Sequence, residues 1–442
     1  MSINLLDLKN FNINSNIIEV VTQYMRNQPS FLHEIIDLSG SPYEIGFQRG
    51  KMFKERLQRD MKKLTFGNPY FPDTWPSPED YSMETIKERA PALFREWENA
   101  LEKTPEWLRE ECRGQADGAG VPYEKMILAG SWFPVILPPE GEPGGPTAPE
   151  DDCNGFIAYG KATANGKPLV GGNGETDHES LRHMAIIRYK NDKYNNFVLQ
   201  NKSPQYPGTQ CGLNEKGVCL FGSGVSIKPD IFGDYGYRGI IRRIVLQEAN
   251  NIDEAIDLFK QGPLMGGQHI YLADKKRAVH IEYAGRNIEV IDPENGFDAG
   301  ASPYFSTPKT QEWCNVISDN TDPNYGYHVA KARGLFRMER WHELFEMHKP
   351  LSIDKIPTLL GDHGGRGTGI VQEHIEGACP QGSDYTICVH GKRSRGTGAT
   401  GGTATSFHSS SFGNISQPEK LKFWVAFGNS CEAGFVPFQP PK

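Results

Sequence analysis

Residues 152–177 read DCNGFIAYGKATANGKPLVGGNGETD, and this stretch decides the fold. Two apolar runs flank Asn165-Gly166, the dipeptide that most strongly indicates a two-residue type I′ hairpin turn. Immediately upstream, residues 138–151 read PPEGEPGGPTAPED, a composition typical of a flexible linker. Cys153 therefore opens an apolar strand directly after a linker, and the position of this cysteine needs an explanation.

The hydrophobic pattern changes at the linker. Before it, residues 1–137 are patterned mainly as helices, including one that begins near Pro42 after a short strand. After it, hairpins and helices come in blocks, which favours an α+β fold over a doubly wound parallel sheet. The sequence thus predicts a mainly helical segment over 1–137, a linker over 138–152 and a second unit over 153–442.

Composition excludes several classes of protein. The chain has 442 residues and a net charge of −8, with no basic patch, which argues against a nucleic-acid partner. No apolar run approaches the ~20 residues of a membrane span, and the N-terminus does not resemble a signal peptide. Eight scattered cysteines without a C-x-x-C pair favour reduced thiols and a cytoplasmic location. We expect no membrane partner and no cofactor.

A cut between Asp152 and Cys153 would give Cys153 both a thiol and a free α-amino group. An α-amine has a pKa of ~7.7–8.0, so it can serve as a base near neutrality, while the thiolate is the nucleophile. One residue would then supply nucleophile and base. The same thiol can make the cut by attacking the carbonyl carbon of Asp152.

The hairpin supplies polar partners for this cysteine. A two-residue turn at Asn165-Gly166 predicts that Asn154 pairs with Asp177, which places Cys153 beside the segment 173–177. The amide of Asn173 could then bind an oxyanion, and a nearby carboxylate could hold the α-ammonium group. The glycines of this strand weaken the prediction of its register. The alternative is that Cys153 is a small hydrophobic residue buried in the core.

Other polar residues suggest weaker hypotheses. A metal-dependent hydrolase could use four C-terminal histidines, which are His363, His374, His390 and His408. Their spacing is not that of metal ligands, so we expect them to lie in solvated loops and to form no metal site. Glu282 lies in a predicted strand and is expected to be structural. Arg242-Arg243 is expected to lie on a solvated helix face.

Several segments occur in the order found in one known family. They are GSPYEIGFQRG (40–50), RGQADGAGVPYEKMIL (113–128), the Asp152-Cys153 boundary, NGKPLVGGNGETD (165–177), GLNEKGVCLFGSGV (212–225) and GYRGIIRRIVLQEANNIDEAIDLF (236–259). The chain therefore resembles penicillin (isopenicillin N) acyltransferase and its relatives, self-processing N-terminal-nucleophile hydrolases, over about residues 35–431.

The resemblance implies a four-layer αββα fold and autocatalytic cleavage before the cysteine, so that a zymogen becomes two associated chains. It implies an enzyme that cleaves or transfers acyl groups on a small-molecule amide or acyl substrate, acyl-CoA included. Cys153 matches the nucleophile. Asn173 matches the asparagine of an N-x-D element, and Glu175 stands at its aspartate, a role that Asp177 could take instead. Arg395 resembles a late arginine motif.

Two departures from the family pattern leave alternatives open. The segment expected to contain a T-N-H element has no asparagine, so the hydroxyl of Ser306 or Thr307 replaces it, the oxyanion is held differently, or activity is lost. Asp152 stands where the penicillin enzyme has glycine. An unprocessed binding protein of the same fold is therefore the alternative to the enzyme.

Overall fold

The computed structural model describes the greater part of the chain. The described residues are 34–62, 87, 95, 98–99, 101–102, 104–130, 153–177, 183–225, 227–228, 231, 239–262, 264–314, 326–364, 386–389, 391–395 and 405–442. The linker at 138–152, including Asp152, lies outside them.

The described strands form two sheets. The first has eight strands in the order β1-β4-β5-β6-β7-β8-β9-β10. They are β1 (Glu34–Gly40), β4 (Ala185–Asn191), β5 (Phe197–Asn201), β6 (Cys211–Asn214), β7 (Cys219–Val225), β8 (Gly267–Ala273), β9 (Ala278–Ala284) and β10 (Asn287–Ile291). The strands from β4 to β10 pair antiparallel, whereas β1 pairs parallel to β4.

The second sheet holds the strand that follows Cys153. Its order is β11-β2-β3-β13-β14-β15, and β12 pairs with β13 outside this path. The strands are β2 (Asn154–Ala158), β3 (Leu169–Asp177), β11 (Phe297–Ala301), β12 (Gly391–Arg395), β13 (Thr405–Gln417), β14 (Lys422–Ala426) and β15 (Phe435–Phe438).

Some of the described helices begin at a side-chain cap. Ser41 and Glu44 form a capping box before Pro42, and Asn251 caps α10. The helices are α2 (Pro42–Met52), α3 (Lys54–Lys62), α6 (Glu106–Ala119), α7 (Tyr123–Gly130), α9 (Ile240–Glu248), α10 (Ile252–Gln261), α11 (Pro308–Gln311), α12 (Gly326–His348) and α13 (Ile356–Leu360), with short 3₁₀ turns at Gly160–Ala162 and Pro418–Lys420.

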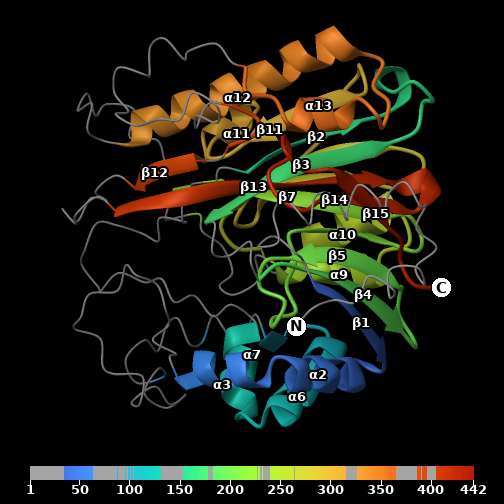
Figure 1. Cartoon of the computed structure of the whole chain (residues 1–442), viewed down its shortest axis with the longest axis vertical. Helices are drawn as coiled ribbons and strands as arrows, with labels where there is room; N and C mark the ends of the chain where they lie inside the picture. The colour runs from blue at the N-terminus through green and yellow to red at the C-terminus, as the bar shows by residue number, and fades with distance from the viewer. Residues whose placement is uncertain are drawn as a thin grey trace.

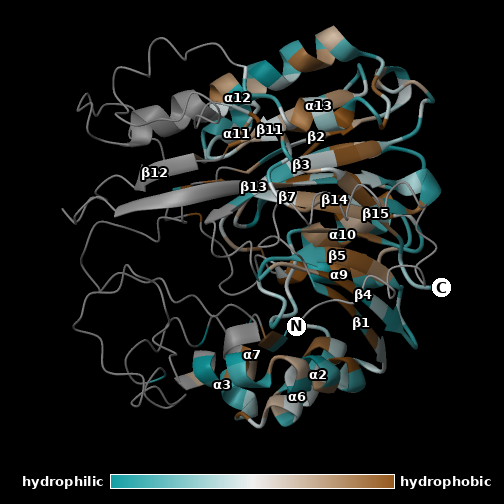
Figure 2. Ribbon diagram, viewed as in Figure 1, coloured by the Kyte–Doolittle hydropathy of each residue, from teal (hydrophilic) through white to brown (hydrophobic). Residues whose placement is uncertain are grey.

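Three buried cores define the layers. One lies between the sheets, where Ile157 and Val170 meet Phe221. A second packs α9 and α10 on the outer face of the first sheet, and a third packs α12 and α13 on the outer face of the second. Figure 1 shows α12 and α13 beside β2, β3 and β11, and Figure 2 shows hydrophobic residues gathered on the strands. This is the expected α+β fold with αββα layers.

The segment before the linker is joined closely to the unit after it. Its strand β1 pairs with β4 over seven positions, from Glu34↔Ala185 to Gly40↔Asn191. Its helices α2 and α6 contribute Arg49 and Glu111 to a buried ion network that continues to Arg243 on α9. The expectation that Arg242-Arg243 is solvated was wrong: both are buried, and the guanidinium of Arg243 stacks on aromatic rings while it binds Glu111.

β2 and β3 pair as the predicted hairpin, but the two-residue turn at Asn165-Gly166 was wrong: the connection spans residues 159–168, and the register differs. Asn154 faces Asn173 rather than Asp177, a shift of four positions. The cause is the connection, in which a 3₁₀ turn at Gly160–Ala162 precedes a turn closed by the Gly166 N–H donating to the Thr163 carbonyl. Because the shift is even, each side chain stays on its predicted face.

The glycines of this hairpin make room for aromatic rings. A Cβ on Gly172 would lie 2.4 Å from the Phe221 ring, and one on Gly155 would lie 2.6 Å from the Tyr271 ring. Rings from the first sheet therefore fit into the surface of the second, and this packing fixes the register that the glycines alone leave open. Within the described residues, no helix is both long and apolar enough to cross a membrane.

Candidate active site

Cys153 lies in the core between the two sheets, one residue before β2. Its side chain is 1% exposed. The backbone N–H of Glu175 donates to Cys153 Sγ at 3.3 Å, and Gln210 Nε2 donates to the same atom at 3.2 Å. Gln210 Nε2 also donates to the Gly222 carbonyl at 2.9 Å, which orients its amide. Two N–H donors on one sulfur stabilise the thiolate, the reactive form.

Two other thiols of this layer are fully buried. Burial raises the pKa of Cys211 on β6 to about 12, and that of Cys219 on β7 to about 12 as well. Such thiols stay neutral at physiological pH and are inert. Cys153, which directly follows the linker, has a sulfur that accepts from the Glu175 N–H and the Gln210 amide.

The backbone of Cys153 is held from β11. The Ser302 N–H donates to the Cys153 carbonyl at 2.9 Å, next to the pair Ala301↔Asn154. The Ser302 hydroxyl donates to the Gly224 carbonyl on β7. Ser302 is thus the residue of this segment that touches the candidate nucleophile.

The two hydroxyl candidates lie farther along the same segment. Ser306 N–H donates to Glu282 Oε1 at 2.7 Å. Thr307 caps α11, with its Oγ1 accepting from Thr310 N at 3.2 Å and lying 2.7 Å from Thr310 Oγ1. The hydrogen bonds of both residues thus run to Glu282 and α11 rather than to Cys153.

Asn173 is adjacent to the cysteine in the sheet, but its side chain points to the helix layer. Asn173 Nδ2 donates to the carbonyls of Leu360 and Ile387, each at 2.8 Å, and Asn173 Oδ1 accepts from Ser430 Oγ at 2.6 Å. Asn154, which faces Asn173, likewise points to α12, where Trp341 Nε1 donates to its Oδ1 at 3.0 Å. The reason is the pleat, because Cys153 and Asn154 are consecutive and must face opposite sides.

The two carboxylate candidates, Glu175 and Asp177, both lie on β3. Glu175 gives its N–H to the thiol, but its buried carboxylate forms an ion pair with Arg337 of α12. Asp177 ends β3, where it pairs with Ser409 of β13. Arg395 ends β12 and pairs with Thr405, also of β13.

Sequence reasoning missed the residues that touch Cys153 and its strand neighbours. Gln210 precedes β6 in an otherwise ordinary turn-rich stretch, and no spacing relates it to Cys153. Arg337 lies on α12, and its contact with Glu175 of β3 is set by tertiary packing. The signal that was available is the alternation of the strand, which already places Asn173 on the face opposite Cys153.

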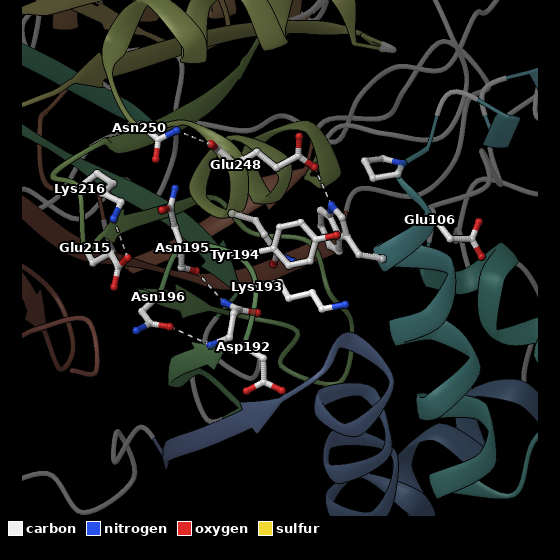
Figure 3. Close-up of a pocket in the computed structure, with 14 residues that line it drawn as sticks. Glu106, Asp192, Lys193, Tyr194, Asn195, Asn196, Glu215, Lys216, Glu248 and Asn250 are labelled. Carbon is white, nitrogen blue, oxygen red and sulfur yellow. Dashed lines mark hydrogen bonds and ion pairs between the residues drawn. The ribbon is translucent and has the colours of Figure 1, made fainter.

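One hollow lies where the segment before the linker meets the unit after it, and another lies between residues 298–308 and α12. One, of about 790 Å³, is lined by polar residues of α6, the β4–β5 turn and the end of α9. Figure 3 shows Glu106 on one side of it and residues Asp192 to Asn196 on the other. The second, of about 680 Å³, is lined by Asp298, Ser306 and Thr307 together with residues of α12. Cys153 lines neither of them.

The model of the acyl-coenzyme A:6-aminopenicillanic acid acyl-transferase family matches residues 163–299. The predicted resemblance is confirmed. The matched stretch runs from the turn of the first hairpin through β11, so it contains Asn173, Glu175 and Gln210 but begins after Cys153.

Individual relatives are distant. An uncharacterized protein of Archaeoglobus fulgidus is 28% identical over 254 residues, which are 54% of this chain and 40% of that protein. The chain thus spans less than half the length of this relative. A mutant conjugated bile acid hydrolase of Clostridium perfringens has 13% identity and a TM-score of 0.35, over 66% of this chain and 97% of that one. Penicillin V acylase of Agrobacterium tumefaciens has 13% identity and a TM-score of 0.31, over 64% and 84%.

Proposed function

We propose that this chain is a self-processing cysteine N-terminal-nucleophile enzyme that hydrolyses or transfers the acyl group of a small linear amide or acyl thioester. The family match supports amide and acyl chemistry of this kind. The observation that carries the proposal is the setting of Cys153, which directly follows the linker and whose Sγ receives N–H donors from Glu175 and Gln210.

Self-processing would begin at Asp152. Cys153 Sγ attacks the Asp152 carbonyl carbon, the C–N bond breaks, and the nitrogen takes a proton to become the free α-amine. The acyl group is then held as a thioester, which water hydrolyses to leave the Asp152 carboxylate and the free thiol. The two N–H donors support the first step because they stabilise the attacking thiolate.

Turnover would reuse the same atoms. The α-amine of Cys153 accepts the thiol proton as Sγ attacks the acyl carbon, and then passes that proton to the leaving amine. The Gln210 amide lies within hydrogen-bond distance of Sγ, so it is suitably placed to donate to the oxyanion that develops on the attacked carbonyl. Water or an acceptor amine then resolves the acyl-enzyme, which gives hydrolysis or transfer.

The two chains produced by the cut would stay associated. The β1–β4 pairing and the buried network of Arg49, Glu111 and Arg243 support this part of the proposal. A contact at the polar hollow adds to it, since Trp107 Nε1 of α6 donates to Glu248 Oε1 of α9 at 2.6 Å. We retain a reduced, cytoplasmic setting for the enzyme because its cysteines lack paired spacing.

An unprocessed binding protein of the same fold is the second candidate. The observation that favours it is that the Asn173 amide and the Thr307 hydroxyl already have structural partners. In that case Cys153 would only be a packed thiol.

Trapping of the acyl-enzyme distinguishes the two. Purified protein is mixed with a panel of N-acyl amides and acyl-CoA thioesters, quenched in acid and measured by intact mass, beside Cys153→Ala and the matched control Cys211→Ala. The enzyme predicts an acyl adduct on the chain that starts at Cys153, present in Cys211→Ala and absent from Cys153→Ala. Two outcomes favour the binding protein. Either all three proteins form the adduct equally, or none of them forms an adduct and none turns over a substrate.

A further inference from the structure

Three electron-pair donors converge on one point between the sheets. They are His269 Nδ1 of β8 and two atoms of β9, His280 Nε2 and Glu282 Oε1. The two nitrogens lie 2.9 Å apart, and Glu282 Oε1 lies 3.1 Å from the His269 nitrogen and 3.9 Å from the His280 nitrogen. All three side chains are fully buried.

In each ring, the nitrogen that faces away from this point, called the outer nitrogen, is a hydrogen-bond donor. His269 Nε2 lies 3.0 Å from the Tyr304 carbonyl oxygen, and His280 Nδ1 lies 2.6 Å from Asp298 Oδ2. A carbonyl or a carboxylate can only accept, so each outer nitrogen carries the proton of its neutral ring. The inner nitrogens are then both lone pairs, and they face each other and a carboxylate oxygen.

Such an arrangement needs a positive charge at its centre. Only one of the two inner nitrogens can carry a proton, because two N–H groups 2.9 Å apart would repel each other. The other contacts of Glu282 are neutral, namely the Ser306 N–H and the Thr310 hydroxyl. With Asp298 and Glu282 ionised the cluster has a formal charge of −2, which one proton halves and one divalent cation neutralises.

The three distances allow one metal ion to contact all three atoms. A triangle with sides of 2.9, 3.1 and 3.9 Å has a circumradius of about 2.0 Å, and Zn–N and Zn–O bonds are about 2.0–2.2 Å. We propose that His269, His280 and Glu282 bind a divalent metal ion of the zinc class. Two histidines and one carboxylate form a recognised zinc ligand set that leaves a position for a fourth ligand.

The surroundings also fit a metal site. Asp298 and the Tyr304 carbonyl orient the two rings, the support that metal-binding histidines generally have. Thr310 Oγ1 donates to the second oxygen of Glu282. The hollow of about 680 Å³ borders the cluster, since Asp298 and Ser306 both line it.

The position suggests a structural role for the metal. Asp298, Tyr304 and Ser306 belong to the same segment as Ser302, whose N–H holds the carbonyl of Cys153. A metal bound to β8 and β9 would fix this segment at three points around Ser302. The proposal does not depend on whether Cys153 is catalytic.

A second cluster must be separated from this one in any test. His363, Cys388 and Cys431 also bring one possible ligand atom each within 4.8 Å of the others. A metal held there would have sulfur ligands, and a metal held by the inter-sheet cluster would not.

The test measures metal content and the spectrum of bound cobalt on the full-length protein. The proteins are the wild type, His280→Gln, Glu282→Gln, Cys431→Ser and, as a histidine control on α12, His348→Gln. Each is desalted and analysed by mass spectrometry for zinc, manganese, cobalt and nickel. Chelator-treated wild type is then titrated with Zn²⁺ and with Co²⁺ while the unfolding temperature and the visible spectrum are recorded.

We expect about one metal per chain in the wild type and both controls, and its loss in His280→Gln and Glu282→Gln. Added Zn²⁺ should raise the unfolding temperature of the chelated wild type, and bound Co²⁺ should show no sulfur-to-metal charge transfer. The wild-type titration keeps the test decisive if the variants fail to fold. No binding of any of the four metals would show that a shared proton fills the cluster, and loss of metal only in Cys431→Ser would assign it to the sulfur cluster; either overturns the proposal.

Discussion

The substitution Glu111→Gln tests how the segment before the linker is joined to the rest of the chain. Glu111 on α6 is the shared anion of two fully buried guanidinium groups, Arg49 on α2 and Arg243 on α9. Glutamine keeps the size of the side chain but removes its charge. Both arginines would then be buried without their counter-ion.

The magnitude follows from this burial. Removing one partner of a buried ion pair costs about 3–5 kcal/mol, because the remaining charge is left uncompensated. Two arginines depend on Glu111, so we expect the loss to lie in the upper half of that range. An exposed pair on the same helix sets the scale for comparison: Glu106 and Arg109 lie 2.6 Å apart and are 60% and 31% exposed, so Glu106→Gln should cost less than about 1 kcal/mol.

The assay is urea unfolding in a Cys153→Ala background, where a single uncut chain avoids concentration-dependent dissociation. Glu111→Gln should lower the midpoint strongly and Glu106→Gln only slightly, with similar slopes. In the Cys153-containing protein, Glu111→Gln should also release the segment before the linker on gel filtration. Equal midpoints for the two variants would refute the argument that this network holds the segments together.

Three further outcomes are expected. Gln210→Ala should slow self-cleavage about 10²-fold, because removal of one oxyanion donor typically lowers a rate by 10²–10³. The rate is measured by pulse-chase labelling, and an unchanged rate would exclude that role. Asn173→Ala leaves the Leu360 carbonyl and the Ser430 hydroxyl without this partner, while the Ile387 carbonyl keeps the Asn154 Nδ2 donor. We therefore expect a loss of about 2–4 kcal/mol in urea unfolding, whereas slowed cleavage at unchanged stability would assign Asn173 to chemistry instead. Burial raises the pKa of Cys112, Cys211 and Cys219 to about 12, so the folded state keeps protons that the unfolded state releases above pH 9.0. Stability should therefore fall between about pH 9 and 12, less so in Cys211→Ala, and an identical decline in that variant would contradict the assignment.

The sequence predicted the fold through local signals. The capping box at Ser41, the cap at Asn251 and the turn around Asn165-Gly166 are all short-range features, and each marks a boundary that the structure has. The arrangement of hairpins and helices in blocks predicted the α+β class, and the family resemblance implied the αββα layers. The register was wrong because a 3₁₀ turn lengthens the connection, and its chemistry is not visible in the Asn-Gly pair.

The candidate site was less predictable for a physical reason. The hairpin places Asn173 and Glu175 beside Cys153 in the sheet, but the pleat turns the two side chains to the helix layer, so only a backbone N–H reaches the sulfur. Gln210 reaches it from the position just before β6 of the opposite sheet, and only packing of the two sheets creates that contact. His269 and His280 meet for a different reason, since the neighbouring strands β8 and β9 of one sheet bring them together although eleven positions separate them in the sequence.

The measurement that tests the central claim most directly is the intact mass of the purified protein under denaturing conditions, beside Cys153→Ala and Cys211→Ala. Self-processing predicts two species of roughly 17 and 32 kDa, from the average residue mass over 152 and 290 residues, in the wild type and in Cys211→Ala. Cys153→Ala should remain uncut at 49.4 kDa. A single 49.4 kDa species in all three proteins would contradict the account and leave the binding protein as the better description.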